Sequence, residues 1–450
     1  ELAQLPGFGQ KKLENLRKNL AFAEVSAQRW HVGAVLPVAL ELLAALRALP
    51  GVQQAEYAGS LRRGKETIGD LDLIVCADDT QAPAIGAAFA QHPLAAQVVA
   101  QGPTKCAIRT VQGLQVDLRI VPASSFGAAL MYFTGSKEHN VALRQRAIDQ
   151  GLRLNEWALL QEDQPVAGAT EAEVYQRLGL TWIPPELREE RGEIALAEHK
   201  QLPRLVEQAD IRAELHAHTT ASDGKMTIRE LVEQALQRGF QTIAVKDHSV
   251  RQTVAHGLTI DRLLQHIEAV RAVAREYADR IQVLAGSEVD ILSDGNLDYP
   301  DEVLAQLDVV VASPHLALAQ EPRKATQRLL RALENPHVCI LGHPTGRLIL
   351  RREGLAPDMQ ALARAAAARG VALEINANHY RLDLRDVHAR LALECGARLA
   401  INTDAHSPVD FDELRYGVLT ARRAGATSAQ VVNCMTRVEL TRWLRAVKPT

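Results

Sequence analysis

The segment VVVASPH, residues 309 to 315, is an apolar run that stops at a side chain able to bind a metal ion, and six other runs behave in the same way. The seven runs are ELHAH (214 to 218), TIAVKDH (242 to 248), VLAGSE (283 to 288), VVVASPH (309 to 315), CILGH (339 to 343), LEINAN (373 to 378) and LAINTDAH (399 to 406). Each run precedes or follows a helix-like stretch. Continuous apolar runs that alternate with helices are typical of buried parallel strands, so the pattern predicts a β/α barrel.

The ends of these predicted strands carry the candidate metal ligands, and in such barrels catalytic groups lie at the carboxyl face. The ligands are His216, His218, His248, Glu288, His315, His343, Asp404 and His406, with Asp223 on the loop after the first strand. Imidazole combined with carboxylate suits Zn²⁺, Mn²⁺ or Fe²⁺ better than Mg²⁺. Nine ligands exceed the needs of one ion, so we expect two or three metals and hydroxide attack on a phosphodiester. A lone strand-end histidine is more often merely buried, but six histidines with three acids disfavour that interpretation.

Composition limits the class of protein. A length of 450 residues predicts two to four domains, and a net charge of -3 argues against a general polyanion-coating protein. Five cysteines without a close pair disfavour a disulfide framework and favour a reducing cytoplasm. No run approaches the roughly 18 apolar residues of a membrane span, so we expect no membrane association.

The rest of the chain predicts further α/β domains before the barrel. Residues 1–50 have helical spacing, 51–123 hold short strands with one helix near 82–91, 124–187 mix helix and turn, 188–211 form a linker, and 212–450 form the barrel. The expected fold is therefore multidomain α/β, with a distorted (β/α)7 barrel at its end.

The segment GSLRRGKETIGDLDLIV, residues 59 to 75, carries a second candidate site. Asp70 and Asp72 are two apart at the start of an apolar strand, so both carboxylates point to one face. Asp117, in LQVDLRIV, is expected to join them from another strand. Three carboxylates without histidine favour Mg²⁺ or Mn²⁺, and two such ions support phosphoryl transfer. The alternative is a pair of solvated acids, which the upstream small-residue turn and Arg63 disfavour because guanidinium matches phosphate.

These residues resemble the nucleotidyltransferase palm of family X DNA polymerases, and MYFTGSKEHNVALR, residues 131 to 144, resembles the start of that family's nucleotide-pocket helix and thumb. The resemblance implies that the three acids are catalytic. It implies a nucleotide site made of Gly59, Ser60, Arg63, Gly69, Tyr132, Phe133, Gly135, Asn140 and Arg144. Gln115 stands where relatives often carry Arg.

The segment LPGFGQKK, residues 5 to 12, resembles a helix-hairpin-helix. Gly7 and Gly9 would expose backbone N–H groups to a DNA phosphate, and Lys11 and Lys12 would add positive charge. An ordinary turn between helices is the alternative that these residues leave open.

The back half resembles the polymerase and histidinol phosphatase (PHP) domain, a trinuclear-metal phosphoesterase, through HAHTTASDG, KDHS, GSEVDILSDG, SPH, GHPTGR and TDAH. The resemblance implies one ligand set of His216, His218, Glu288 and Asp404, with His315 and His343 near Glu288, and another of Asp223, His248 and His406. Arg347 is either a phosphate contact or a surface cation. Glu374 and Asn376 either support the ligands or are simply buried.

Together the two halves resemble bacterial family X DNA polymerases with a PHP domain, without the lyase-type domain at the start. The resemblance implies a DNA repair enzyme that fills gaps and acts as a 3′–5′ exonuclease, with abasic-site cleavage as a further option. Its expected partners are gapped duplex DNA, primer 3′ ends and deoxynucleoside triphosphates, and we expect a monomer in the bacterial cytoplasm, associated with the nucleoid. The alternatives are a PHP nuclease or phosphatase whose front half only holds DNA, and a non-enzymatic DNA-end-binding scaffold.

Overall fold

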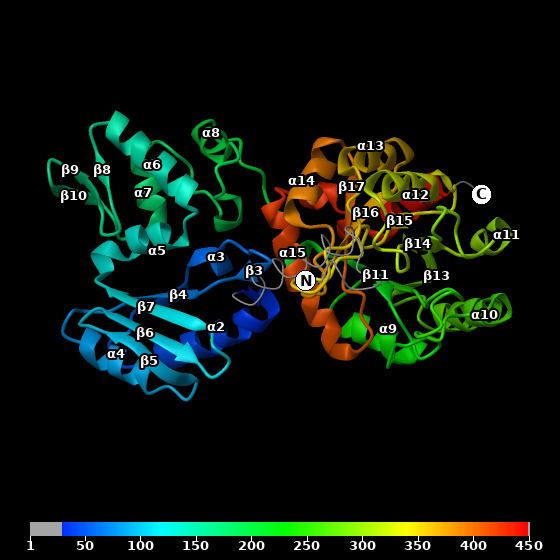
Figure 1. Cartoon of the computed structure of the whole chain (residues 1–450), viewed down its shortest axis with the longest axis horizontal. Coiled ribbons are helices and arrows are strands. Elements are labelled where there is room, and N and C mark those ends of the chain that lie inside the picture. The colour runs from blue at the N-terminus through cyan, green and yellow to red at the C-terminus, as the bar shows by residue number, and fades with distance from the viewer. Residues whose placement is uncertain (1–28, 449–450) are drawn as a thin grey trace, which may run out of the picture. The chain divides into compact units, whose positions relative to one another are not determined.

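The computed structural model of the chain describes residues 29–448 (Figure 1). The chain divides into two compact units, Glu1–Leu202 and Pro203–Thr450, and each is described by itself. The hairpin-like residues Gly7, Gly9, Lys11 and Lys12 lie outside the described residues. No helix in the part that the structure describes is both long and apolar enough to span a bilayer.

A five-stranded sheet forms the centre of the first unit, in the order β2-β4-β7-β6-β5. Its strands are β2 (Gln54–Tyr57), β4 (Leu71–Cys76), β5 (Ala95–Gln101), β6 (Lys105–Thr110) and β7 (Gln115–Val121), and the short β1 (Trp30–His31) pairs with β3 (Thr67–Ile68). Strand β4 is parallel to β7 and antiparallel to β2. The sequence predicted four of these strands and missed β5, an edge strand whose residues are nearly all exposed and whose segment AAQVVAQ shows no strict alternation of apolar and polar residues.

Helices α2 (Val32–Arg47), α3 (Gly59–Arg62) and α4 (Ala82–Ala90) accompany this sheet. The sequence predicted α4 near residues 82–91. Helix α2 buries Val35, Ala39, Leu42 and Leu46, which recur at helical spacing and form one apolar stripe. Arg47 at its end donates to Ala55 O of the neighbouring β2 (2.6 Å), which fixes that end against the sheet.

Residues after the sheet build a second layer of the first unit around α5 (Phe126–Thr134), α6 (Lys137–Asp149), α7 (Glu171–Arg177) and α8 (Glu193–Glu198). A three-stranded antiparallel sheet of β8 (Arg153–Leu154), β9 (Leu159–Gln161) and β10 (Gln164–Ala167) lies beside them. The expectation of helix and turn alone was incomplete because these strands are only two to four residues long. The core of this layer contains Leu143, Val174 and Tyr175, together with Ala197 of α8.

The second unit is the predicted barrel, and each of the seven apolar runs forms one of its strands (Figure 1). The strands are β11 (Ala213–Ala217), β12 (Thr242–Val245), β13 (Gln282–Asp290), β14 (Val309–Ser313), β15 (Ile340–Leu341), β16 (Ala372–Asn376) and β17 (Arg398–Asn402). All neighbouring strands pair in parallel and in chain order. A parallel bridge between Ala217 and Ala405 brings the first and last strands together, so the sheet is nearly closed.

Helices cover the outside of this barrel and bury one stripe each. They are α9 (Ile228–Gln237), α10 (Ile260–Glu276), α11 (Asp301–Leu304), α12 (Pro322–Glu334), α13 (Met359–Arg369), α14 (Asp386–Glu394), α15 (Leu414–Arg423) and α16 (Arg437–Val447). Short 3₁₀ turns of the second unit lie at Gln208–Asp210, Pro408–Glu413, Ser428–Gln430 and Val432–Cys434. Two further turns, Ala123–Ser125 and Pro185–Leu187, belong to the first unit. In α12 the buried positions Ala325, Leu329 and Ala332 follow the helical period.

Candidate active sites

The first candidate site lies where β4 and β7 run side by side. Asp72 of β4 and Asp117 of β7 are register partners, so the two acids are direct neighbours across the strands. Asp70, one residue before β4, is two positions from Asp72 and shares its face of the strand. Gln115 Nε2 donates a hydrogen bond to Asp117 Oδ2 (2.9 Å). The structure therefore brings the three predicted acids together.

The surroundings of Asp72 shift the pKa of its carboxyl group. Burial and the negative charges of Asp70 and Asp117 raise the pKa of Asp72 to about 7, although Arg119 and Arg63 oppose the rise. Like charges this close disfavour the ionised form unless a cation lies between them. A donor set of carboxylate oxygens alone fits a hard divalent cation such as Mg²⁺ or Mn²⁺.

Gly59 is required beside Asp72 for a steric reason. Its φ is +62°, in the left-handed region, and a Cβ placed on it would lie 2.3 Å from Asp72 Oδ2. Only glycine combines that backbone conformation with so close an approach. The small-residue turn quoted from the sequence therefore makes room for the carboxylate.

A cavity of about 520 Å³ opens beside these acids in the first unit. All nine residues predicted to bind nucleotide line it, together with Asp70 and Asp72. The cavity walls also include four residues that sequence reasoning missed, namely Arg29, Lys65, Thr134 and Lys137. Three of these four carry positive charge, as do the predicted Arg63 and Arg144, so the cavity attracts an anion such as a polyphosphate.

Several contacts fix the cavity walls. Arg63 Nε pairs with Glu189 Oε1 (3.0 Å), and Lys65 Nζ lies 3.3 Å from Glu189 Oε2. Asn140 Nδ2 donates to Tyr132 O (2.7 Å), which ties the start of α6 to the end of α5. Cations and an aromatic edge are thereby held around one space before any ligand binds.

The second candidate site lies at the carboxyl end of the barrel strands, and its ligand atoms fall into three groups. The groups are His218, Asp223, His248 and His406; His216, His218, Glu288 and Asp404; and His248, Glu288 and His315. In each group the ligand atoms lie within 4.8 Å of one another. The groups share members, which is the arrangement expected of neighbouring metal ions with bridging ligands.

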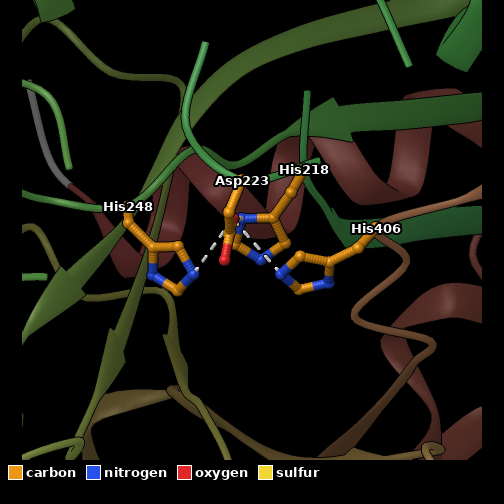
Figure 2. A group of neighbouring side chains, drawn as sticks. All are labelled: His218, Asp223, His248 and His406. Atoms are coloured by element: carbon orange, nitrogen blue, oxygen red, sulfur yellow. Dashed lines mark ion pairs between the residues drawn. The ribbon is translucent and has the colours of Figure 1, made fainter. Parts of the chain in front are cut away.

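Figure 2 shows the first of these groups, with three imidazoles arranged around the carboxylate of Asp223. Asp223 Oδ1 lies 3.3 Å from His406 Nε2, 3.6 Å from His248 Nε2 and 3.9 Å from His218 Nδ1. These side chains come from the segments that follow β11, β12 and β17, so residues far apart in the chain meet at one point.

Glu288 lies at the centre of the other two groups. Its Oε1 is 2.8 Å from His343 Nε2 and 3.2 Å from His315 Nε2, and its Oε2 is 3.0 Å from His248 Nδ1. Asp404 Oδ1 is 2.9 Å from His218 Nε2. Asp404 also has a φ of +54°, a left-handed conformation that non-glycine residues adopt rarely and that clusters at functional sites.

Burial and the charges of neighbouring side chains shift the pKa values of this cluster in opposite directions. Burial and the nearby His406 and His248 lower the pKa of His218 to about 4. Burial alone would lower the pKa of His315, yet the charge of Glu288 raises it to about 9. The histidines hold the pKa of Glu288 well below its usual range in spite of burial. Glu288 is therefore an anion at neutral pH, as a metal ligand must be.

Several donor atoms of the cluster are also free of hydrogen bonds, as atoms that bind a metal ion would be. Among the described residues, four buried polar atoms of the three ligand groups make no hydrogen bond, although some lie within ion-pair distance of one another: His216 Nε2, His218 Nδ1, His248 Nδ1 and Glu288 Oε2. Buried polar atoms in native proteins nearly always have partners, so a group of exceptions in one place needs a missing partner. Imidazole nitrogens and carboxylate oxygens together suit Zn²⁺, Mn²⁺ or Fe²⁺.

A layer of polar residues supports the ligands from behind. Glu374 Oε1 lies 2.7 Å from His216 Nδ1, and Asn376 Nδ2 donates to Asp404 Oδ2 (2.9 Å), in line with the supporting role considered for both residues. Sequence reasoning missed Asp290, whose Oδ1 lies 2.9 Å from His315 Nδ1. A carboxylate behind a ligating histidine orients its ring, so Asp290 in GSEVDILSDG was a detectable signal.

Asp247 is a second supporting residue that sequence reasoning missed. It accepts hydrogen bonds from Thr219 and Ser222 of the loop that carries Asp223, and it lies 2.8 Å from His266 Nε2. These contacts hold the pKa of Asp247 below its usual range despite burial. Asp247 therefore fixes the loop of one metal ligand while its neighbour in sequence, His248, supplies another.

Arg347 and Lys246 differ from simple surface cations. The interpretation of Arg347 as a surface cation is wrong, because the side chain is 3 % exposed and Nη2 donates to Leu382 O. Lys246 is fully buried inside the barrel, where its Nζ donates to Val309 O and burial lowers its pKa to about 7. Both cations stabilise backbone carbonyls within the barrel.

Comparison with known proteins adds to this geometry. Residues 129–189 match the family model of the DNA polymerase beta thumb, and residues 214–378 match that of the PHP domain. The chain is 38 % identical over 446 residues to the DNA polymerase/3′-5′ exonuclease PolX of Bacillus subtilis, which covers 98 % of this chain and 77 % of that protein. A probable phosphatase of a Thermoanaerobacter species is 28 % identical over 229 residues, covering 48 % of this chain and 88 % of that protein. With its thumb, its nearly closed barrel and this similarity over almost all of its residues, the chain belongs to the PolX family of DNA polymerase/3′-5′ exonucleases that carry a PHP domain.

Proposed function

We propose that this chain is a DNA-directed DNA polymerase and a 3′–5′ exodeoxyribonuclease, with one activity in each compact unit. The observation that carries the proposal is the direct pairing of Asp72 with Asp117 beside a cation-lined cavity, in a chain whose barrel also gathers a cluster of metal-type ligands. Two sites with different donor sets support two reactions on the same kind of phosphodiester bond.

In the first unit, Asp70, Asp72 and Asp117 would hold Mg²⁺ or Mn²⁺. Such ions lower the pKa of a primer 3′ hydroxyl and neutralise charge on the departing pyrophosphate. Arg63 and the other cations of the cavity bind the triphosphate, because guanidinium and ammonium groups match phosphate oxygens.

The remaining walls of the cavity would place the nucleotide. Aromatic rings give a stacking surface, and a glycine permits close approach of the backbone. The residues proposed to bound the sugar are Tyr132, Phe133 and Gly135, those proposed to approach the base pair are Asn140 and Arg144, and those that supply the turn next to the carboxylates are Gly59, Ser60 and Gly69.

In the barrel, two or three ions of Zn²⁺, Mn²⁺ or Fe²⁺ would be held by the nine ligands in the overlapping groups described above. Ions of this kind activate water and stabilise the leaving oxygen of a phosphodiester. The chain's own contribution is to fix the ligands through Glu374, Asn376, Asp290 and Asp247. The Asp223 and His406 side chains are about one third exposed, so the substrate phosphate reaches the site from their side.

The finer substrate assignment follows the same reasoning. We propose gapped duplex DNA, primer 3′ ends and deoxynucleoside triphosphates as substrates, with abasic-site cleavage as a second reaction of the barrel. Gly7, Gly9, Lys11 and Lys12 would hold a DNA phosphate without reading sequence. A monomer in the bacterial cytoplasm, acting at the nucleoid in base-excision repair, fits these substrates.

The test is an end-labelled gapped duplex incubated with the full chain and either Mg²⁺, Mn²⁺ or Zn²⁺, with and without nucleotides. We expect the primer to lengthen by the size of the gap when nucleotides are present and to shorten from its 3′ end when they are absent. Shortening without any lengthening would contradict the polymerase assignment and support a nuclease whose front half only holds DNA. Neither change, with the DNA still bound, would support an inert end-binding scaffold.

A further inference from the structure

Two loops at the carboxyl face of the barrel carry a local concentration of positive charge. The charge lies in two segments, 344–352 and 377–385, of the loops that follow β15 and β16, and the exposed Glu353 comes directly after the first segment. The two segments contain five arginines and one acid, namely Arg347, Arg351, Arg352, Arg381, Arg385 and Asp383. Arg347 is buried, and the other four arginines reach the surface. Asp383 is fully buried and accepts hydrogen bonds from Thr345, so it does not offset the charge at the surface.

An aromatic side chain stands in the middle of this charge. Tyr380 is 38 % exposed, and the guanidinium carbon of Arg351 lies over its ring, 4.9 Å from the ring centroid. The ring of His379 lies 4.1 Å from that of Tyr380. His379 is itself held by Glu413 Oε2, 2.6 Å from its Nδ1. The three side chains therefore form one cluster, in which the two rings are tilted by 39°; it is called the platform here and consists of His379, Tyr380 and Arg351.

The platform is attached to the metal-ligand cluster through the backbone. Asn376, whose side chain donates to Asp404, lies four residues before Tyr380, so their Cα atoms are at most about 14 Å apart. Ile349 N, on the loop that follows the ligand His343, donates to Tyr380 O (2.7 Å). Asn378 Oδ1 accepts from Tyr380 N (3.0 Å) and shapes the turn. The two loops therefore fix the backbone of Tyr380 four residues after Asn376, which supports the ligand Asp404.

We propose that this platform binds the unpaired bases at the 3′ end of a DNA strand while the barrel cleaves it. Proteins that bind single strands combine aromatic or arginine planes, on which bases stack, with cations along the backbone. A plane of this kind takes an unpaired base, because the bases of a duplex already stack on their neighbours. The metal ligands His216, His218 and Glu288 are fully buried and Asp223 and His406 are about one third exposed, so the strand end would enter from the side of Asp223 and His406. The inference rests on the proposed exonuclease activity and adds the residues that hold the end of its substrate strand.

The direct test is photocrosslinking of the full chain to a single-stranded oligonucleotide that carries 5-iodo-2′-deoxyuridine near its 3′ end, in EDTA. The base analogue reacts with an aromatic ring in contact with it, and mass spectrometry locates the crosslink. We expect the crosslinked peptide to contain Tyr380, with Tyr380→Ala losing the crosslink and Tyr380→Phe keeping it. Crosslinks confined to other peptides would overturn the proposal.

A kinetic test adds a second readout with metal present. Loss of one stacked base is expected to raise the KM of Tyr380→Ala and Arg351→Ala for a single-stranded 3′ end about tenfold, with kcat nearly unchanged. Arg445→Ala is the matched control, because Arg445 lies beside Gln282 at the opposite end of strand β13 and should leave KM as it is. An unchanged kcat for degradation in each variant reports intact folding of the barrel, which carries all three substitutions.

The two tests separate failure of the platform from failure of the activity on which it rests. An unchanged KM in Tyr380→Ala would overturn the platform. Absence of degradation by the wild type would overturn the exonuclease assignment. In that case the crosslinking result alone would decide whether the platform binds DNA.

Discussion

The two candidate sites offer contrasting sets of donor atoms to a cation. The site in the first unit consists of three carboxylates at the edge of an open cavity, and Asp70 is exposed. The barrel site surrounds Glu288 with imidazoles, and His216 and His218 are fully buried. Oxygen-only sites suit weakly held Mg²⁺ that arrives with a phosphate ligand, whereas imidazole cages retain transition metals. If both sites bind metal as proposed, the contrast predicts one site that exchanges its ions during turnover and one that keeps them.

The two sites also differ in how the neighbouring side chains shift the pKa of the central carboxyl group. Around Asp72, burial and the neighbouring acids dominate and raise its pKa, so the site is incomplete without added cations. Around Glu288 the histidines already lower the pKa of the carboxyl, so the protein itself supplies part of the balancing charge. A site of the first kind depends on its substrate complex, and one of the second kind is preassembled.

Of the changes that test this difference between the two sites, removal of the metal ions should reduce activity most. After treatment with a chelator, both activities should fall at least about a thousandfold, since such ions contribute several kcal/mol to each transition state. Adding Mg²⁺ alone should restore primer extension but not degradation, and adding Mn²⁺ or Zn²⁺ should restore degradation. Metal analysis of the untreated chain should find transition metal that is lost in His218→Ala. Equal restoration of both activities by Mg²⁺ would remove the distinction between the sites.

The stability of the first unit should depend on a buried ion pair of its own, separately from the barrel. Glu171 binds Arg188 through two hydrogen bonds of 2.7 and 3.1 Å, and also Arg62, which follows the Gly59 turn. Arg188 is fully buried, so Glu171→Gln would leave its charge without compensation and cost about 3–5 kcal/mol. Calorimetry should show an earlier transition of the first unit, with degradation by the barrel retained. Loss of both activities at the same temperature would contradict separate units.

The same pair predicts a pH dependence. Burial alone would raise the pKa of Glu171, but Arg188 and Arg62 hold it well below its ordinary value of 4.5. A carboxyl with a lowered folded pKa stabilises the protein above its unfolded pKa, and this contribution is lost as the pH falls below about 4.5. The wild type should therefore lose more stability than Glu171→Gln over that range, measured by denaturant unfolding. Parallel losses in the two proteins would show that this pair does not set the acid sensitivity.

Gly59→Ala should damage extension while sparing degradation. The added Cβ would lie 2.3 Å from Asp72 Oδ2 and would face a left-handed backbone, so the carboxylate must move. A displacement of this size in a reacting group costs about a hundredfold in kcat. Single-turnover extension measures the loss, and degradation of the same labelled DNA is the internal control. Normal extension would show that Asp72 does not hold a cation in the observed position.

The smallest expected effect on primer extension comes from Gln115, which contacts the third acid, Asp117. Gln115 donates to Asp117 Oδ2, and Gln115→Ala removes one hydrogen bond worth about 0.5–1.5 kcal/mol. Extension should slow by roughly two- to tenfold. Gln97→Ala is the matched control, because Gln97 lies exposed on the edge strand β5 and its loss should leave the rate unchanged. An unaltered rate in Gln115→Ala would show that this contact only orders the strand.

The sequence predicted what local periodicity and strand ends indicate, including the meeting of Asp117 with Asp70 and Asp72, and it missed side chains that join a site only through tertiary folding. The seven barrel strands followed from apolar runs ending at ligands, since strand ends share one face of a barrel. The pairing of Asp72 with Asp117 required a strand register that no local pattern specifies. Lys65 and Lys137 joined the cavity through tertiary folding, whereas Asp290, two residues after the ligand Glu288, was a signal that the sequence offered and that was missed. The short strands β8 to β10 have too few residues to display a period.

The most direct measurement of the central claim compares Asp72→Ala with His406→Ala on one end-labelled gapped duplex. The account predicts that Asp72→Ala abolishes lengthening of the primer and keeps its shortening, and that His406→Ala keeps lengthening and loses most of the shortening. If either substitution removed both activities equally in a folded chain, two independent metal sites would be the wrong description.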